Sequence, residues 1–296
     1  MDWDDLRVFL AVARSDSLTG AGKVLRLDPA TVGRRIARLE EACATALFVK
    51  SPQGYAMTEG GQRLLVHAVT VEQGVQEASD ALRGDTERLS GQIRIGAPDG
   101  CANFLLPQVC ARLCDENPGL EVQIIALPRV FNLSRREADM AVAVSRPSAG
   151  RVMVQRLADY QLHLAASEDY LHRNPPLNTP ADLRNHRLVG YIPDMIFDKE
   201  LDYLAEVGAG TVALASNSVS VQFNWLRAGA GIGVVHDFAV PFAPELRRVM
   251  IDRISLRRSF WLIRHADDRR LDRLSRFAEA FVGEFRRELA RLEALA

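Results

Sequence analysis

The sequence predicts an α/β fold class, with an all-α winged helix-turn-helix at the N-terminus. Three observations support this prediction: short amphipathic helices in the first 60 residues, a long proline-free stretch over 62–89, and then short apolar strands alternating with helices. Such alternation is typical of an α/β sandwich with largely parallel sheets. A chain of 296 residues, 48% of them hydrophobic, is long enough for a small domain and a larger one.

A basic helix over residues 28–41 is the most informative element. Asp28 suits its N-cap because a carboxylate accepts hydrogen bonds from first-turn amides, and Pro29 suits its first position. One stripe of the helix is apolar: Val32, Ile36 and Leu39. The opposite face and its edges carry Ala30, Thr31, Arg34, Arg35 and Arg38. A small-residue, basic face can enter a DNA major groove, although an ordinary solvated surface helix has the same pattern.

The flanking segments favour DNA binding. Upstream, one amphipathic helix carries Leu6, Phe9, Leu10 and Ala13, and a second starts at Ser17. Two short helices before a basic helix form the helix-turn-helix arrangement. Downstream, residues 47–50 and 55–58 are strand-like around a turn at 52–54, which predicts a wing. We expect contacts with backbone phosphates from Ser17, Thr19, Lys50, Ser51 and Gln53.

This segment resembles the LysR-type transcriptional regulators. The resemblance rests on Asp5-Leu6-Arg7-Val8-Phe9, Ser17-Leu18-Thr19, Pro29-Ala30-Thr31-Val32, Arg35-Ile36, Leu39-Glu40, Leu47-Phe48 and Thr58-Glu59-Gly60-Gly61. The chain departs from the family pattern at four places. Gly22 replaces an alanine, Gly33 a serine, Ala44-Thr45 a glycine turn, and Lys50 the wing arginine. Gly33 lacks a hydroxyl that could touch DNA, so the departures affect operator preference more than the module.

Charge and cysteine usage narrow the class of protein. The net charge is −1, but residues 21–55 hold six Lys and Arg against three Asp and Glu, so positive charge is local. We expect a cytoplasmic protein with no membrane partner, because no signal peptide or apolar span is found. The four cysteines and six histidines form no metal motif, so no metal or cofactor is expected. A buried, reduced thiol is the default for Cys101, and redox sensing is the alternative.

Residues 62–90 predict a long helix with a heptad seam. Its apolar positions are spaced four, three, four, three and four: Leu64, Ala68, Val71, Val75, Ala78 and Leu82. This spacing predicts pairing with a partner helix, and a single helix packed on its own domain is the alternative. In the family that the chain resembles, this linker helix makes the dimer. We therefore expect a homodimer, assembled into a tetramer, on double-stranded DNA with a dyad-symmetric operator.

The remainder predicts alternating strands and helices. Strands are expected at 93–95, 121–126, 140–144, 161–166, 188–191, 211–215, 232–235 and 259–263, and helices at 103–117, 168–172, 197–206, 218–228 and from 268. The resemblance implies a periplasmic-binding-protein-like (type 2) effector domain with crossovers near Leu157–Gln161 and Ile263–Asp267. We divide the chain into a DNA-binding domain at 1–61, a linker helix at 62–90, and an effector domain at 91–296. Its subdomain I is 91–160 with 265–296, and its subdomain II is 161–264.

Ligands in such sheets bind where strands end and helix N-termini offer free amides. By position, the candidate effector-binding residues are Asp99, Cys101, Asn103, Arg129, Phe131, Tyr191, Ile192, Asn217, Ser218 and His236. Tyr191 and Phe131 suit the core equally well, and for His236 a histidine that binds no ligand is favoured. Asp99 either caps the following helix or favours a cationic or hydroxyl-rich ligand, since it would repel a carboxylate.

No enzyme motif is present in the sequence. Residues 229–233 (Gly-Ala-Gly-Ile-Gly) lie between a helix and a strand, whereas a dinucleotide loop follows a strand. His163, Asp159 and Ser167 lie along one strand with no motif to unite them. We expect a regulator, not an enzyme, whose operator binding or DNA bending responds to a small-molecule effector, and which contacts RNA polymerase. An α/β enzyme with a helical accessory domain, and a ligand-binding module whose basic helix contacts protein, are the alternatives.

Overall fold

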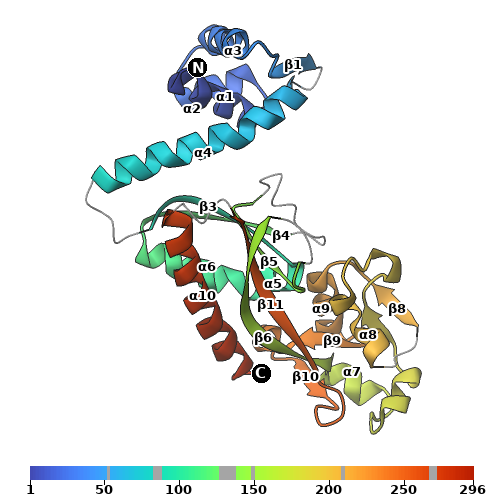
Figure 1. Cartoon of the computed structure of the whole chain (residues 1–296). Coiled ribbons are helices and arrows are strands. Elements are labelled where there is room, and N and C mark those ends of the chain that lie inside the picture. Colours follow the sequence, from blue (N-terminus) through green and yellow to red (C-terminus); the bar gives the residue numbers. More distant parts are fainter. Residues whose placement is uncertain (52–53, 83–88, 127–137, 148–150, 208–210, 267–271) are drawn as a thin grey trace. The chain divides into compact units, whose positions relative to one another are not determined.

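The structure is a computed structural model that describes residues 1–51, 54–82, 89–126, 138–147, 151–207, 211–266 and 272–296. The chain divides into two compact units, Met1–Glu87 and Arg88–Ala296 (Figure 1). Each unit has a hydrophobic core of its own. None of the helices in the described ranges combines the length and apolar composition that a membrane span requires.

The N-terminal unit is a winged helix-turn-helix followed by a long helix, as the sequence predicts. Its elements are α1 (Trp3–Ser15), α2 (Leu18–Leu25), α3 (Pro29–Cys43), β1 (Phe48–Ser51), β2 (Gly54–Met57) and α4 (Glu59–Leu82). The predicted cap of α3 is confirmed, because the Asp28 carboxylate accepts a 2.8 Å hydrogen bond from the Thr31 amide. The predicted apolar stripe of α3 is also confirmed: Val32, Ile36 and Leu39 are all buried.

The turn after α3 contains one of the departures from the family pattern. Ala44 ends the helix in the left-handed conformation, at φ 48° and ψ 35°, where glycine is usual. A Cβ atom in this conformation crowds the following carbonyl oxygen, so the chain holds a strained residue here.

We therefore expect Ala44→Gly to raise the free energy of unfolding by about 1 kcal/mol, because glycine adopts this conformation without strain. Urea unfolding of the full chain measures the change. Ala42→Gly is the matched control: Ala42 is exposed within the same helix, and its replacement should destabilise by about 1 kcal/mol. An Ala44→Gly variant no more stable than the original chain would contradict the strain.

The C-terminal unit is built on one nine-stranded sheet in the order β4-β3-β5-β11-β6-β9-β7-β8, with β10 paired to β6. Its strands are β3 (Ser90–Ala97), β4 (Gly119–Ala126), β5 (Met140–Ala143), β6 (Val152–Ser167), β7 (Leu188–Gly190), β8 (Val212–Ala215), β9 (Ile232–His236), β10 (Leu246–Val249) and β11 (Leu256–His265). Parallel pairs lie on both flanks, at β3 with β4 and β5, and at β7 with β8 and β9.

The centre of this sheet is antiparallel, so the prediction of largely parallel sheets is only half right. The whole of β11 pairs with the first part of β6, from Leu256 opposite Leu162 to His265 opposite Val152. Each also pairs with a flank, β11 with β5 and β6 with β9. The sequence pattern misses their length because each strand passes from one half of the unit to the other. In β11 the register shifts at a bulge between Phe260 and Trp261, where its pairing with β5 begins.

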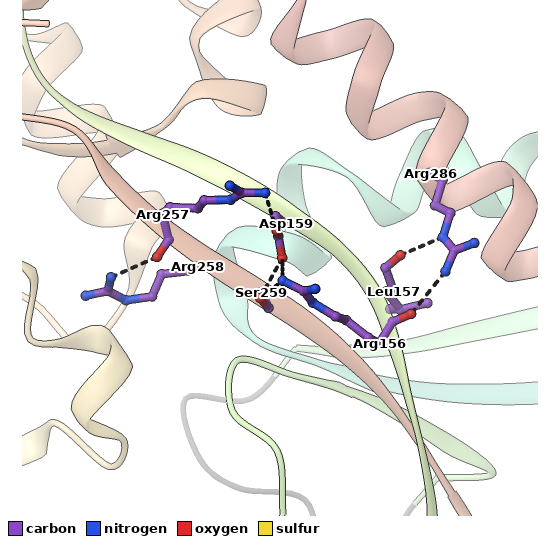
Figure 2. Close-up of polar contacts among 7 residues, drawn as sticks. All are labelled: Arg156, Leu157, Asp159, Arg257, Arg258, Ser259 and Arg286. Atoms are coloured by element: carbon purple, nitrogen blue, oxygen red, sulfur yellow. Dashed lines mark hydrogen bonds and ion pairs between the residues drawn. The ribbon is translucent and has the colours of Figure 1, made fainter. Parts of the chain in front are cut away.

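Side chains tie β6 to β11 beside this bulge (Figure 2). The Asp159 carboxylate accepts hydrogen bonds from the Ser259 hydroxyl at 2.7 Å and from the Arg257 guanidinium at 2.5 Å. It also pairs with Arg156. These donors, Ser259 first, lower the pKa of Asp159. Arg286 of the last helix donates to the backbone carbonyls of Leu157 and Arg156, which fixes β6 against that helix.

The helices of this unit cover the sheet. They are α5 (Asp99–Phe104), α6 (Leu106–Glu116), α7 (Glu168–Arg173), α8 (Tyr203–Glu206), α9 (Val219–Arg227) and α10 (Asp272–Glu293), with 3-10 turns at Pro180–Asn185, Pro193–Met195, Lys199–Leu201 and Asp237–Phe242. The helix α10 packs along α6 (Figure 1). One stripe of α10 lies in the core: Leu274, Phe277, Phe281, Phe285 and Leu289 are buried.

Two predicted helices are corrected. The single helix expected at 103–117 is two helices, α5 and α6, and it starts earlier, at Asp99. The break falls at Leu105, since Pro107 cannot donate a hydrogen bond within the preceding turn. The helix expected at 197–206 is largely irregular, with a 3-10 turn at Lys199–Leu201 and only the short α8.

Candidate DNA-binding and effector-binding sites

Arg34 is an exposed cation on the predicted DNA-reading face. Its guanidinium is exposed and donates a 2.9 Å hydrogen bond to the Thr31 hydroxyl. Among the described residues, no carboxylate forms an ion pair with it. Ala30 is exposed and Gly33 half-buried on the same helix. This face thus presents one unpaired positive charge beside a hydroxyl and small side chains.

Arg38 and Arg35 instead bind α3 to α1. Arg38 Nε donates to Asp5 Oδ2 at 2.8 Å, and its second nitrogen bonds Asp5 Oδ1. Arg35 lies 3.7 Å from Asp4 and 4.0 Å from Asp5. Asp5 is buried, so part of the positive charge that the sequence assigns to DNA is balanced within the domain. Sequence reasoning missed Asp5, although it belongs to the motif that carries the resemblance.

The remaining predicted phosphate contacts lie at α2 and the wing. The Ser17 hydroxyl caps α2 by accepting from the Gly20 amide at 2.8 Å, and Thr19 is exposed in the first turn. Lys50 and Ser51 lie in β1, but their side chains, and Gln53 entirely, are outside the described residues. The sequence also missed Glu40, whose Oε1 accepts from the amides of Leu47 and Phe48 and so joins α3 to the wing.

The predicted seam of α4 has two parts. Ala68 is buried and Leu64 half-buried against the core of the same unit. Farther along the helix, Val71 and Val75 are 42% and 44% exposed, and Ala78 is exposed too. The Leu82 side chain lies outside the described residues. The Arg14 guanidinium binds Glu72 at 3.0 and 2.5 Å, which fixes α4 to α1. The first turns of the seam are thus covered within the chain, and the later turns are bare.

The structure brings Asp99 and Ser218 together, from opposite halves of the sheet. The Asp99 carboxylate accepts from the Ser218 hydroxyl at 3.1 Å and from the Asn103 amide group at 3.1 Å. The Ser218 hydroxyl also caps α9. Asn217, which precedes Ser218 in the chain, is half-buried, as is Ile192, and Arg129 and Phe131 lie outside the described residues. Asp99 does not cap its own helix; its carboxylate instead accepts from the Ser220 amide in the first turn of α9.

His236 lies in an aromatic environment at the end of β9. Its ring packs on Tyr160 at 5.5 Å and meets Tyr203 at 6.1 Å between ring centroids. Burial lowers the pKa of His236 to about 4, so its imidazole is neutral at physiological pH. Nδ1 of His236 is buried with no hydrogen-bond partner among the described residues. Sequence reasoning missed Tyr160 and Tyr203, because nothing in their spacing relates them to residue 236.

A cavity of about 120 Å³ lies between the end of β7, α9 and the segment before α8. It is lined by Val189, Gly190, Tyr191, Pro193, Ile196, Leu201, Asp202, Tyr203, Leu204, Val212, Gln222 and Val234. Of the predicted residues, only Tyr191 is in this lining. The cavity is mainly apolar, with hydroxyl and amide groups at Tyr191 and Gln222, which suits a small organic ligand.

The cysteines and the possible metal ligands of the described residues were the other candidates for a reactive site. Burial raises the pKa of the Cys101 thiol well above its ordinary value and that of Cys110 to about 12. A thiol is reactive as the thiolate, so these observations favour a structural Cys101 over a redox sensor. Within the part of the chain that the structure describes, no three His, Cys, Asp or Glu side chains gather as metal ligands would.

A winged helix-turn-helix joined to a larger unit with a ligand-sized cavity defines a DNA-binding regulator. Two family models match the chain: "Bacterial regulatory helix-turn-helix protein, lysR family" over residues 3–62, and "LysR substrate binding domain" over residues 86–286. The chain belongs to the LysR family of transcriptional regulators, and the resemblance expected from its first residues is confirmed.

Relatives and solved structures agree with this assignment. The HTH-type transcriptional activator TtdR of Escherichia coli (strain K12) is 27% identical over 259 residues, 83% of this chain and 81% of that protein. The Mau operon transcriptional activator of Paracoccus denitrificans is 27% identical and covers 89% of each chain. A full-length OxyR variant from Pseudomonas aeruginosa has the same fold, with a TM-score of 0.69 at 17% identity over 97% of this chain and 98% of that one.

Proposed function

We propose that this regulator reads a dyad-symmetric operator with the exposed face of α3. The observation that carries this proposal is Arg34, an exposed guanidinium with no ion pair among the described residues, held beside Thr31. Thr31, Arg34, Ala30 and Gly33 would face the bases, and Thr19, Lys50, Ser51 and Gln53 the phosphates. Arg35 and Arg38 would brace α3 through Asp4 and Asp5, and Ser17 would brace α2 as its cap.

In this proposal the chain acts as a homodimer joined through α4. Val71, Val75 and Ala78 would pair with the same residues of a second copy, and Leu64 and Ala68 would hold α4 to its own domain. We divide the chain at 61 and 90, with subdomain I at 91–160 and 265–296 and subdomain II at 161–264. The dimers would join into tetramers and contact RNA polymerase in the cytoplasm. We propose no catalytic activity, because the known relatives are named as transcriptional regulators.

A small molecule would bind between the halves of the C-terminal unit and change operator binding or DNA bending. Such a ligand shifts the equilibrium only if its affinities for the two states differ. Of the predicted contacts, Tyr191 lines the cavity, and Asp99, Ser218 and His236 lie at the junction of the halves. Cys101, Asn103, Ile192, Asn217, Arg129 and Phe131 stay predictions.

Selection from a pool of random duplexes tests the DNA-binding part. The full chain is expected to enrich a sequence with two inverted half-sites, because a two-fold dimer presents two recognition helices. Small molecules are then titrated onto the complex with the selected duplex, with footprint and bend as readouts. Enrichment of no symmetric sequence would contradict the operator proposal. A footprint and bend that stay unchanged with every bound ligand would contradict the effector proposal.

A further inference from the structure

The N-terminus of α9 already holds a carboxylate. Asp99 Oδ2 accepts from the Ser220 amide at 2.9 Å, the Ser218 hydroxyl at 3.1 Å and the Ser220 hydroxyl at 3.2 Å. The next amide, that of Val221, donates to the Ser218 hydroxyl at 3.3 Å. Helix N-termini attract anions because their first amides lack partners within the helix. Here those donors are directed to a side chain of the same chain.

The helix α5 reaches across the sheet at two further points. A side-chain carbon at Gly100 would lie 3.0 Å from Cε1 of His236 and 3.3 Å from Cγ1 of Val219, so the α5 backbone approaches β9 and α9 closely. Phe104, at the other end of α5, packs against Phe223 of α9 at 4.7 Å between ring centroids, with the rings tilted by 55°. Contacts at three positions of α5, namely Asp99, Gly100 and Phe104, thus hold the two halves together without a ligand.

The described cavity is lined by residues of the same half of the unit as α9, between positions 189 and 234, and its lining also lacks a cation. The only formally charged side chain in its described lining is that of Asp202, and its polar neighbours are Tyr191 and Gln222. No Lys or Arg of that lining could neutralise an incoming carboxylate. Nδ1 of His236, a residue 5% exposed, has no partner in the described structure and faces the same junction at Gly100. An uncharged or cationic ligand meets no electrostatic penalty here, whereas an anion would be repelled by Asp99 and Asp202.

We propose that Asp99 is a specificity-determining residue. Its carboxylate occupies the N-terminus of α9, where an anionic ligand would otherwise bind. The carboxylate joins the two halves of the C-terminal unit and repels effectors that carry a carboxylate. The effector is therefore an uncharged or cationic small molecule. This inference rests on the proposed effector function, and it assigns the chemical class of that effector. Removing the carboxylate is expected to turn the α9 N-terminus into a site for a free anion.

The experiment is chemical rescue of Asp99→Ala in the full-length chain. The variant is expected to lower the melting temperature of the C-terminal unit by roughly 4–8 °C, since α9 loses a charged hydrogen-bond partner. Sodium formate, which replaces the carboxylate, is expected to restore the melting temperature of the variant with a saturable dependence on concentration. Sodium chloride at the same ionic strength, the unchanged chain, and Asp115→Ala, an exposed aspartate of α6, should show no such rescue.

Asp99→Asn provides a second measurement, because asparagine keeps the shape of the side chain and fills the space that formate needs. We expect a lower melting temperature, faster hydrogen exchange of the Ser220 amide, and no rescue by formate. The proposal is overturned if both variants keep the original melting temperature, or if formate stabilises the unchanged chain and Asp99→Ala equally. These assays contain no DNA, so a failure here is distinct from a failure of operator recognition, which the duplex selection measures.

Discussion

Arg34→Ala is expected to weaken binding to the selected operator by roughly 10- to 100-fold, the range for losing one arginine that reads a base. Arg34 is exposed and unpaired within the described structure, so its charge is available to DNA. Arg38→Ala should weaken operator binding less than Arg34→Ala does, because the charge of Arg38 is already balanced by Asp5. Titrations at several salt concentrations measure the affinity and, through the slope, the number of phosphates neutralised.

The double variant Arg34→Ala, Arg38→Ala should lose most operator binding, since it removes one reading group and the brace of its helix. Arg184→Ala is the matched control: it deletes one exposed arginine from the C-terminal unit and should leave affinity and salt slope unchanged. If Arg34→Ala binds the operator as tightly as the unchanged chain does, α3 is not the reading element. The basic helix would then be an ordinary surface helix.

Val71→Glu together with Val75→Glu is expected to dissociate the dimer. These two valines are 42% and 44% exposed on the later turns of α4, and charges on a heptad seam would face their own copies. Sedimentation should show the mass of a single chain. Operator affinity should fall on the order of 100-fold or more, because each chain would hold one half-site without the second.

The control places the same charges on the polar side of α4. Gln62→Glu with Thr70→Glu changes two exposed residues of the same helix and should keep both mass and affinity. A dimer that survives Val71→Glu, Val75→Glu would show that the bare turns of α4 are not the pairing surface, and that α4 serves only its own domain.

Local patterns predicted the N-terminal unit well because its structure depends on neighbours in sequence. The cap at Asp28 and the stripe of Val32, Ile36 and Leu39 lie within one helix, where spacing fixes which face is buried. The pairing of Arg38 with Asp5 spans 33 residues, so no helical wheel reveals it. The same limit hid the α9 cap, since Asp99 and Ser220 are 121 residues apart.

The larger unit shows where periodicity loses information. Short strands such as β5 and β9 were placed correctly from their apolar runs. The long strand β6 was not, because its first half is largely half-buried or exposed and only its second half is largely buried. The cavity was predicted only through Tyr191, since its other lining residues come from the segment at 193–204 and from β7, β8, β9 and α9, which no local pattern relates to one another.

The two long central strands also restrict how a signal can travel through the C-terminal unit. Because β11 is hydrogen-bonded along its entire length to residues 152–162 of β6, the halves are joined by a two-stranded ribbon rather than by loose loops. A ribbon resists stretching and sideways shear but yields to torsion, and a bulge increases its local twist. Rotation of one half against the other would therefore change the twist of the ribbon at Phe260–Trp261. The bond between Asp159 and Arg257 would keep β6 and β11 together beside this point. Effector binding would then change the angle between the two halves by a small rotation, and almost no hydrogen bonds between the strands would break.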